Sequence, residues 1–214
     1  LASADDADLE LSSKSVSAQR SVFVAALDDF AAVGIEPEFV HLANTAGALW
    51  HPDSRFNLVR VGIGMYGLSP NAERAGSEQL GLIPAMTVVA RVSSLKKVSA
   101  GAGVSYSHTW IAKRETQLGL VPVGYADGIP RNASNRVAVA IGGKIVSQVG
   151  TIAMDQFVVD CTDLGAEVSA GAQVYVFGSG AHGEWTADQW GLECGSLGYE
   201  IVTRLGARIP RVHL

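Results

Sequence analysis

Two tyrosines in the stretch from residue 100 to residue 128 have the side chain and the surroundings expected of acid–base groups. Tyr106 ends the tripeptide Val104-Ser105-Tyr106 after a glycine-containing turn, and Tyr125 lies between a glycine and an alanine. Small neighbours of this kind present a phenol to a ligand. A phenol with the ordinary pKa of about 10 is a poor base at neutral pH, so a catalytic tyrosine needs a cationic or hydrogen-bonding neighbour. The alternative is a turn tyrosine whose ring packs on its own domain.

Length and charge limit the classes of protein to which the chain can belong. The sequence has 214 residues, enough for one large or two ordinary domains. It carries 16 basic and 21 acidic residues, a net charge of −5, and no basic run that could neutralise nucleic-acid phosphates. No apolar run approaches the roughly 18 residues of a membrane helix. We therefore expect neither a nucleic-acid partner nor a membrane partner.

The cysteines and histidines show no spacing typical of a metal site. Cys161 and Cys194 are far apart in the sequence and fit neither a metal-binding pair nor a disulfide framework. We expect two buried thiols in a reduced compartment, with the protein in the cytoplasm, and no metal.

The first 80 residues predict the elements of a parallel α/β unit. Residues 1–13 are polar and acidic and indicate a loop. Residues 15–33 have apolar side chains at helical spacing with a broad buried stripe, a start capped by Ser15 or Ser17, and an end at Gly34. Two apolar runs, residues 39–42 and 58–63, predict strands, and residues 46–50 a short helix between them. Apolar strands of this kind are typical of parallel sheets.

From residue 82 onward the pattern changes to short alternating strands separated by glycine-rich turns. The pair Gly142-Gly143 predicts a tight hairpin. A helix around residues 186–194 and a second at 196–205 follow the strands, so this part predicts a mainly β domain. The expected strands are residues 86–92, 118–123, 137–141, 144–149, 157–160 and 173–177.

Six short motifs, taken together and in order, resemble those of the alanine racemases. Any one of them alone is a weak signal, but their order and spacing extend over the whole chain. The motifs are HLANTAG (41–47), RVGIGMYG (60–67), GVSY (103–106), GYADGIPR (124–131), GTIAMDQ (150–156) and GYE to RIPR (198–211).

The resemblance implies a fold, a cofactor and an assembly. Residues 1–80 would be the last part of a (β/α)8 barrel that binds pyridoxal 5′-phosphate, and residues 82–214 a β-rich C-terminal domain. The family works as a homodimer with active sites built from both subunits, and it supplies D-alanine for the bacterial cell wall. Its members bind the cofactor covalently through a lysine in an early motif that is absent here. We therefore expect the chain to be the C-terminal part of a longer enzyme, inactive by itself.

The resemblance also implies roles for individual residues. Tyr106 would be the catalytic acid–base on one face of the substrate, with the missing lysine serving the other face. Arg60 would face the pyridine nitrogen of the cofactor, whose other contacts would come from His41, Thr45, Gly62, Ile63 and Tyr199. Met154, Tyr125, Asp155 and Arg131 would lie at the substrate end. Thr151 stands where many members carry arginine.

Other interpretations remain open for these residues and for the chain. Arg60 could form a surface ion pair, the glycines after residue 60 could be simple turn residues, Met154 could lie in the core and Asp155 could cap a turn. The protein could be a related racemase with a wider pocket, for example for serine. It could also be a non-catalytic dimerisation or binding module if it is complete as given.

Overall fold

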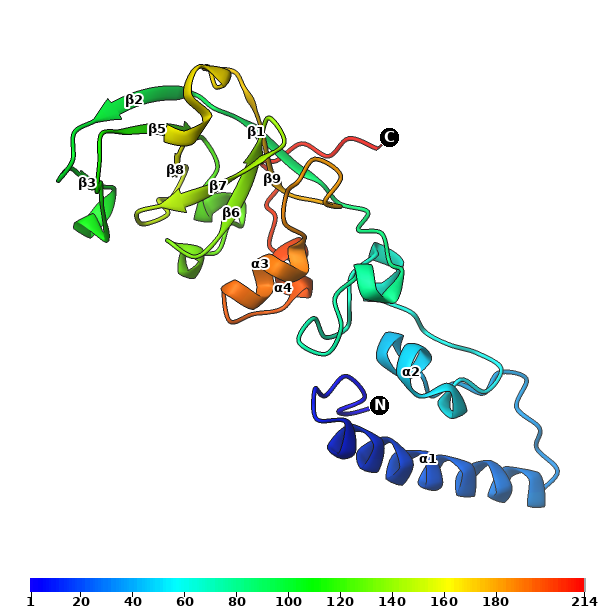
Figure 1. Ribbon diagram of the computed structural model, residues 1–214. Coiled ribbons are helices and arrows are strands. Elements are labelled where there is room, and N and C mark those ends of the chain that lie inside the picture. The colour runs from blue at the N-terminus through cyan, green and yellow to red at the C-terminus, as the bar shows by residue number, and fades with distance from the viewer. Residues whose placement is uncertain (214) are drawn as a thin grey trace. The chain divides into compact units, whose positions relative to one another are not determined.

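The computed structural model describes residues 1–213, which divide into a helical unit, Leu1–Ile83, and a β-rich unit that begins at Pro84 (Figure 1). Among these residues, no helix combines the length and the hydropathy that crossing a membrane would require.

The first unit contains one long helix, α1 (Leu9–Ala32), and a short one, α2 (Thr45–Trp50). The side chain of Asp8 caps α1 by accepting hydrogen bonds from the backbone N–H groups of Glu10 and Leu11. The predicted start at Ser15 or Ser17 is wrong, because the helix begins earlier, at a cap formed by Asp8 within the segment that was predicted to be a loop. Gly34 follows the helix with a φ of +75°, which confirms the predicted stop. Three short 3-10 turns complete the unit: Pro52–Ser54, Ile63–Tyr66 and Glu78–Leu80.

The apolar stripe of α1 is only partly covered within this unit. Val16 packs into a small cluster with Ala4 and Ala46, against which Leu1 and Trp50 also pack. Val22 lies on the same helix with 74% of its surface exposed. The prediction of a broad buried stripe is therefore wrong for the described residues, because few of them pack against this helix beyond its first turns.

The two strands predicted in the first unit are reduced to a single parallel bridge between His41 and Leu58. The prediction of strands at residues 39–42 and 58–63 is wrong in the described residues, although the parallel direction and the short helix between them are confirmed. Parallel strands are stable when neighbours cover both edges and both faces. Among residues 1–213, the one bridge that these two segments form joins them to each other.

The second unit is built on a curled antiparallel sheet of seven strands in the order β1-β9-β6-β7-β8-β5-β2 (Figure 1). Four strands confirm the predictions to within one residue: β6 (Ala138–Ile141), β7 (Lys144–Val149), β8 (Phe157–Asp160) and β9 (Gln173–Phe177). The predicted hairpin turn is also confirmed, since Gly142 and Gly143 both have positive φ between the paired residues Ile141 and Lys144.

Three further strands have no clear signal in the sequence. β2 (Ser94–Val98) carries two lysines and lies at a sheet edge, where polar residues are common. β3 (Gly103–Val104) and β4 (Trp110–Ile111) have two residues each and pair with one another. The other two strands, β1 (Val88–Arg91) and β5 (Thr116–Val121), lie within or close to the ranges predicted for them.

Helices α3 (Ala187–Glu193) and α4 (Gly198–Thr203) confirm the helical C-terminal part and close one side of the core. The side chain of Thr186 caps α3, and Trp190 of this helix is fully buried with its ring 6.1 Å from that of Phe177 in β9. The core around them consists mainly of β-branched side chains from the central strands, among them Val139, Val159, Val174 and Val176.

Candidate active site

In the first unit, Arg60 and His41 form a hydrogen-bonded pair. Arg60 Nε donates to His41 Nε2, and His41 Nδ1 lies 3.4 Å from the carbonyl oxygen of Leu58. Because a guanidinium can only donate, His41 Nε2 must accept, which places the imidazole hydrogen on Nδ1, where it can be donated to Leu58. The backbone N–H of Arg60 donates to the carbonyl of Ala43 at 2.9 Å. The arginine is thus held by its side chain and its backbone on the segment that carries the histidine.

Thr45 joins the segment after Arg60 to the start of α2. Its buried Oγ1 accepts hydrogen bonds from the backbone N–H groups of Gly62 at 3.0 Å and Gly64 at 3.4 Å. A hydroxyl that accepts twice still has its single hydrogen to donate. Gly64 permits this close approach, because a Cβ on it would lie 2.9 Å from Thr45 Cγ2. Ile63 begins the next 3-10 turn, so a hydroxyl and a backbone N–H are available in one place, the donors that suit a phosphate group.

In the second unit, Tyr106 lies on a turn in which the neighbouring residues have unfavourable backbone conformations. Ser105 has φ +60° and ψ −167°, a region that is nearly restricted to glycine, and Ser107 and His108 have φ of +60° and +45°. Such residues cost about 1–3 kcal/mol each and persist only where the surroundings hold them. The phenol between them is 68% exposed. The interpretation of Tyr106 as a ring packed on its own domain therefore disagrees with the structure.

The residues that hold this turn come from the loop between β7 and β8. Ser105 Oγ donates to the carbonyl of Thr151 at 2.6 Å, and Thr151 Oγ1 donates to the carbonyl of Tyr106 at 2.9 Å. A Cβ on Gly150 would lie 2.8 Å from the carbonyl oxygen of Val104. The turn and the loop are therefore in direct backbone contact.

The same loop supports Tyr125 from its other end. The backbone N–H of Tyr125 donates to the carbonyl of Ala153 at 3.0 Å, and that of Ala126 to the carbonyl of Met154 at 2.9 Å. Gly124 lies so close to the backbone of this loop that an added Cβ would be 2.3 Å from the carbonyl oxygen of Ala153. Tyr125 and Met154 are both exposed, by 42% and 53%. Within residues 1–213 the N–H of Met154 makes no hydrogen bond and can be offered to a ligand.

Arg208 connects the Tyr125 turn to Asp155. Its Nε donates to Asp127 Oδ1 at 2.9 Å and its Nη2 to Asp155 Oδ1 at 2.8 Å. The other oxygen of the buried Asp127 accepts from the backbone N–H of Gly124 at 2.9 Å. The hydrogen bonds to Asp155 and Asp127 raise the pKa of Arg208 above its ordinary value. In this chain the Asp155 carboxylate is therefore engaged with the C-terminal segment.

Arg131 and Tyr199 are the two remaining candidate residues of the second unit. Arg131 lines a surface cavity of about 270 Å³ with Tyr125, Gly128 and Arg204. Tyr199 lies on α4 and is partly exposed, and its carbonyl accepts a hydrogen bond from Thr203 Oγ1 at 2.7 Å.

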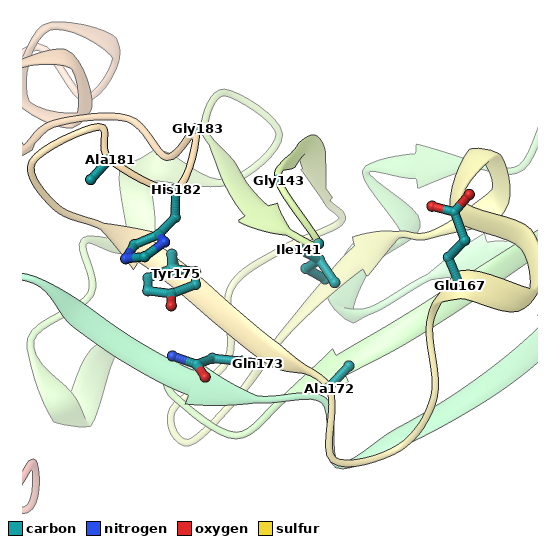
Figure 2. A pocket seen from close by; sticks show the side chains of 10 residues that line it. Ile141, Gly143, Glu167, Ala172, Gln173, Tyr175, Ala181, His182 and Gly183 are labelled. Atoms are coloured by element: carbon teal, nitrogen blue, oxygen red, sulfur yellow. The ribbon is translucent and has the colours of Figure 1, made fainter.

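A larger cavity, of about 690 Å³, lies elsewhere in the second unit (Figure 2). The Gly142-Gly143 turn and the loop around His182 border it, and the His182 ring stacks on Tyr175 with the centroids 3.9 Å apart. The Gly142-Gly143 turn precedes β7 whereas Gly150 follows it, so the cavity and the Tyr106 turn lie at opposite ends of this six-residue strand, which is roughly 20 Å long.

The structure thus forms two groups from the predicted residues. His41, Arg60, Thr45, Gly62 and Ile63 lie together in the first unit, and Tyr106, Tyr125, Met154 and Asp155 are tied to one loop in the second. The sequence reasoning missed Thr109, Asn135 and Arg208 as supports. Arg208 and its partner Asp127 fall within the motifs noted in the sequence, so that signal was present, whereas nothing marked Thr109 or Asn135.

Comparison with known proteins decides the family. The family model described as "Alanine racemase, C-terminal domain" matches residues 85–213. The model described as "Alanine racemase, N-terminal domain" matches residues 1–70. The chain belongs to the alanine racemase family. The resemblance inferred from the six motifs is thereby confirmed.

Individual alanine racemases are similar over nearly all of this chain. That of Frankia casuarinae is 47% identical over 196 residues, 92% of this chain and 50% of the relative, and that of Salinispora arenicola is 49% identical over 194 residues, 90% and 50%. The crystal structure of alanine racemase from D-cycloserine-producing Streptomyces lavendulae has a TM-score of 0.89 at 44% identity and covers 100% of this chain and 55% of that one. The Streptomyces coelicolor alanine racemase has a TM-score of 0.89 at 45% identity, with 98% and 53% covered.

Two conclusions follow from these alanine racemase structures. The predicted fold class, the last part of a (β/α)8 barrel followed by a mainly β domain, is confirmed. The chain spans about half the length of the curated relatives it matches.

Proposed function

We propose that this chain forms the C-terminal part of a pyridoxal-phosphate-dependent enzyme that interconverts L-alanine and D-alanine, with residues 1–80 from the barrel and residues 82–214 as the β domain. The observation that carries the proposal is the exposed phenol of Tyr106 on a strained, externally supported turn in a chain of this family. A phenol that only packs in a core would not need such a turn.

The residues of the first unit fit the cofactor. Pyridoxal phosphate, when bound, withdraws electrons from the α-carbon of an amino acid and so makes its proton acidic. The Thr45 hydroxyl and the Ile63 N–H, beside Gly62, would donate to its phosphate together with Tyr199. Arg60, oriented by His41, would face the ring nitrogen and keep it unprotonated, because a guanidinium has no proton acceptor.

The residues of the second unit fit the amino acid. Tyr106 would give or take the α-proton on one face, and a lysine outside this sequence would serve the other face and hold the cofactor. Racemisation requires two such groups, since a single base returns its proton to the side from which it came. The Met154 N–H, which has no partner in residues 1–213, would bind the substrate carboxylate. Tyr125, with Asp155 and Arg131, would narrow the entrance so that a methyl side chain is favoured.

The assembly follows from the same proposal. The active site would combine the cofactor group of one subunit with the tyrosine group of the partner in a homodimer. The product D-alanine would serve peptidoglycan synthesis in the cytoplasm of a bacterium.

The direct test is a racemisation assay of the full-length protein with L-alanine and with L-serine, in which circular dichroism measures the loss of optical activity of each amino acid. The proposal predicts racemisation of alanine at least about 10-fold faster than of serine, since one added hydroxyl changes discrimination by about this much. It also predicts loss of activity when the cofactor is removed and recovery when it is restored. Comparable rates for both amino acids would favour a broad-specificity racemase, and no racemisation of either would favour a binding module.

A further inference from the structure

Thr151 holds the Tyr106 turn through both its side chain and its backbone. Its hydroxyl donates to the carbonyl of Tyr106 at 2.9 Å, and its own carbonyl accepts from Ser105 Oγ at 2.6 Å. The residue is buried, with 7% of its surface exposed. One bond therefore holds Tyr106 itself and the other holds Ser105, the residue before it, although Thr151 lies 45 positions after Tyr106 in the sequence.

The hydrogen bonds around Thr151 have a defined direction. A threonine hydroxyl has one hydrogen, and Thr151 uses it for Tyr106, so the 3.2 Å contact with Thr109 Oγ1 must be donated by Thr109. Thr109 Oγ1 in turn accepts from Asn135 Nδ2 at 3.0 Å. Asn135 is anchored by its Oδ1, which accepts the N–H of Gly150 at 2.6 Å. A chain of donors therefore runs from Asn135 through Thr109 and Thr151 to the carbonyl of Tyr106.

This chain of bonds acts where the backbone is most strained. The residue before Tyr106 and the two after it have positive φ without being glycine, and such conformations relax when their supports are removed. The bonds reinforce one another because each donor in the chain is also an acceptor. Removal of the central hydroxyl would free the Tyr106 carbonyl and let the turn move toward ordinary conformations.

We propose that Thr151 is a positioning residue for Tyr106, acting through the hydroxyl chain that fixes the strained turn. The inference rests on the proposed function, because it assigns the fixed phenol to proton transfer. It also gives a specific role to a position at which the resemblance leads one to expect arginine. The role belongs to the hydroxyl, so serine can replace it and valine, of the same shape, cannot.

The first test measures proton exchange in the full-length holoenzyme. The α-proton exchange of L-alanine and of D-alanine with deuterated water is followed separately by NMR for wild type, Thr151→Val and Thr151→Ser. We expect valine to slow exchange from the enantiomer that depends on Tyr106 by on the order of 100-fold, the effect of a misplacement of about 1 Å. Exchange from the other enantiomer and KM should change less than about threefold, and serine should restore the rate.

A matched control separates positioning from general destabilisation. Thr162 Oγ1 donates to Asp160 and accepts from the N–H of Gln117, after the end of β8 that is remote from this loop. Thr162→Val should lower the unfolding midpoint without any asymmetry between the enantiomers. Equal slowing of both enantiomers by Thr151→Val, or serine no better than valine, would overturn the inference.

A second measurement does not depend on activity. This chain contributes five tyrosines to the labelled protein, and the 3-fluorotyrosine resonance of Tyr106 is identified by its loss in Tyr106→Phe. We expect Thr151→Val, but not Thr151→Ser, to shift and broaden it. An unchanged resonance in Thr151→Val would refute the positioning role even if the enzyme is a racemase. Failure of wild type to racemise alanine, with the resonance shifted, would refute only the proposed function.

Discussion

The two units of the molecule contain apolar segments of similar sequence, of which only those in the second unit form strands. Val59, in the first unit, belongs to an apolar run and is 38% exposed with a single bridged residue beside it. Val139, in the second unit, belongs to an equally apolar run and is fully buried between two paired strands. The difference teaches that β-propensity alone does not form a strand, because a strand needs neighbours that satisfy its backbone and cover its faces.

The same contrast separates the two groups of candidate residues. Arg60 and Thr45 are held by a few bonds within a short segment. Tyr106 is held by a chain of four hydrogen bonds that passes through Thr151, Thr109 and Asn135 and ends on Gly150. We therefore expect substitutions of the residues that support Tyr106 to disturb both stability and proton transfer.

The largest expected effect is a difference in hydrogen exchange between these segments. In this chain, the amides of Val59 and Val61 should exchange at least about 1,000-fold faster than those of Val139 and Ala140, because central strands open only with global unfolding. Mass spectrometry of peptic fragments measures both regions in one sample. Equal protection would show that residues 58–63 form a strand as stable as β6, and it would contradict the difference between the two units.

The next effect concerns the close contact beneath Tyr125. Gly124→Ala places a Cβ 2.3 Å from the backbone oxygen of Ala153, so we expect a loss of about 3 kcal/mol in the free energy of unfolding of the second unit. Urea unfolding measures it. The matched control is Gly206→Ala, where the nearest atom is 3.5 Å away, and it should change stability by less than about 0.5 kcal/mol. A tolerated Gly124→Ala would mean that the loop is looser than described.

A smaller effect is expected from the ion pairs of Arg208. Arg208→Gln leaves the buried Asp127 with one donor fewer and should lower the free energy of unfolding by more than a change at an ordinary surface ion pair does. Arg204→Gln, which removes a pair between two half-exposed side chains on α4, should cost less than about 0.5 kcal/mol. If both variants lose the same stability, Arg208 does not support the Tyr125 turn more than an ordinary surface pair would.

The last effect appears only at alkaline pH and concerns the buried thiols. Burial raises the pKa of Cys161 and of Cys194 from about 9 to about 11. Between these values the unfolded chain has lost the protons that the folded chain keeps, so stability is full below pH 9 and falls as pH rises to about 11. In urea titrations, Cys161→Ala/Cys194→Ala should show a shallower decline over this range than wild type. If the stability of the double variant and of wild type declined equally with pH, the raised pKa values of Cys161 and Cys194 would be contradicted.

The sequence predicted the second unit better than the first for a physical reason. The alternation in β7 and the Gly142-Gly143 turn are local signals, and the partners of β7 lie within the same unit. For residues 58–63 the local pattern was equally clear, but the neighbours that such a strand needs are not among the described residues. β3 and β4 could not be found because two-residue strands are defined by their pairing and not by a pattern.

The residues of the candidate site were proposed from the sequence, but the residues that support them were not. The motif around Tyr106 identified the tyrosine and its turn. It could not reveal that Ser105, Ser107 and His108 adopt conformations that their residue types disfavour. Nor could it reveal that Thr109 and Asn135, 26 positions apart, share a hydrogen bond, because such contacts exist only after folding.

The central claim is that the phenol of Tyr106, presented by the β-rich unit, transfers the α-proton on one face of the substrate. The most direct test is α-proton exchange from each alanine enantiomer in full-length Tyr106→Phe. Phenylalanine keeps the ring and removes the hydroxyl, so exchange from one enantiomer should fall by roughly 100- to 10,000-fold while exchange from the other continues and the cofactor still binds. Near-normal exchange from both enantiomers would contradict the account.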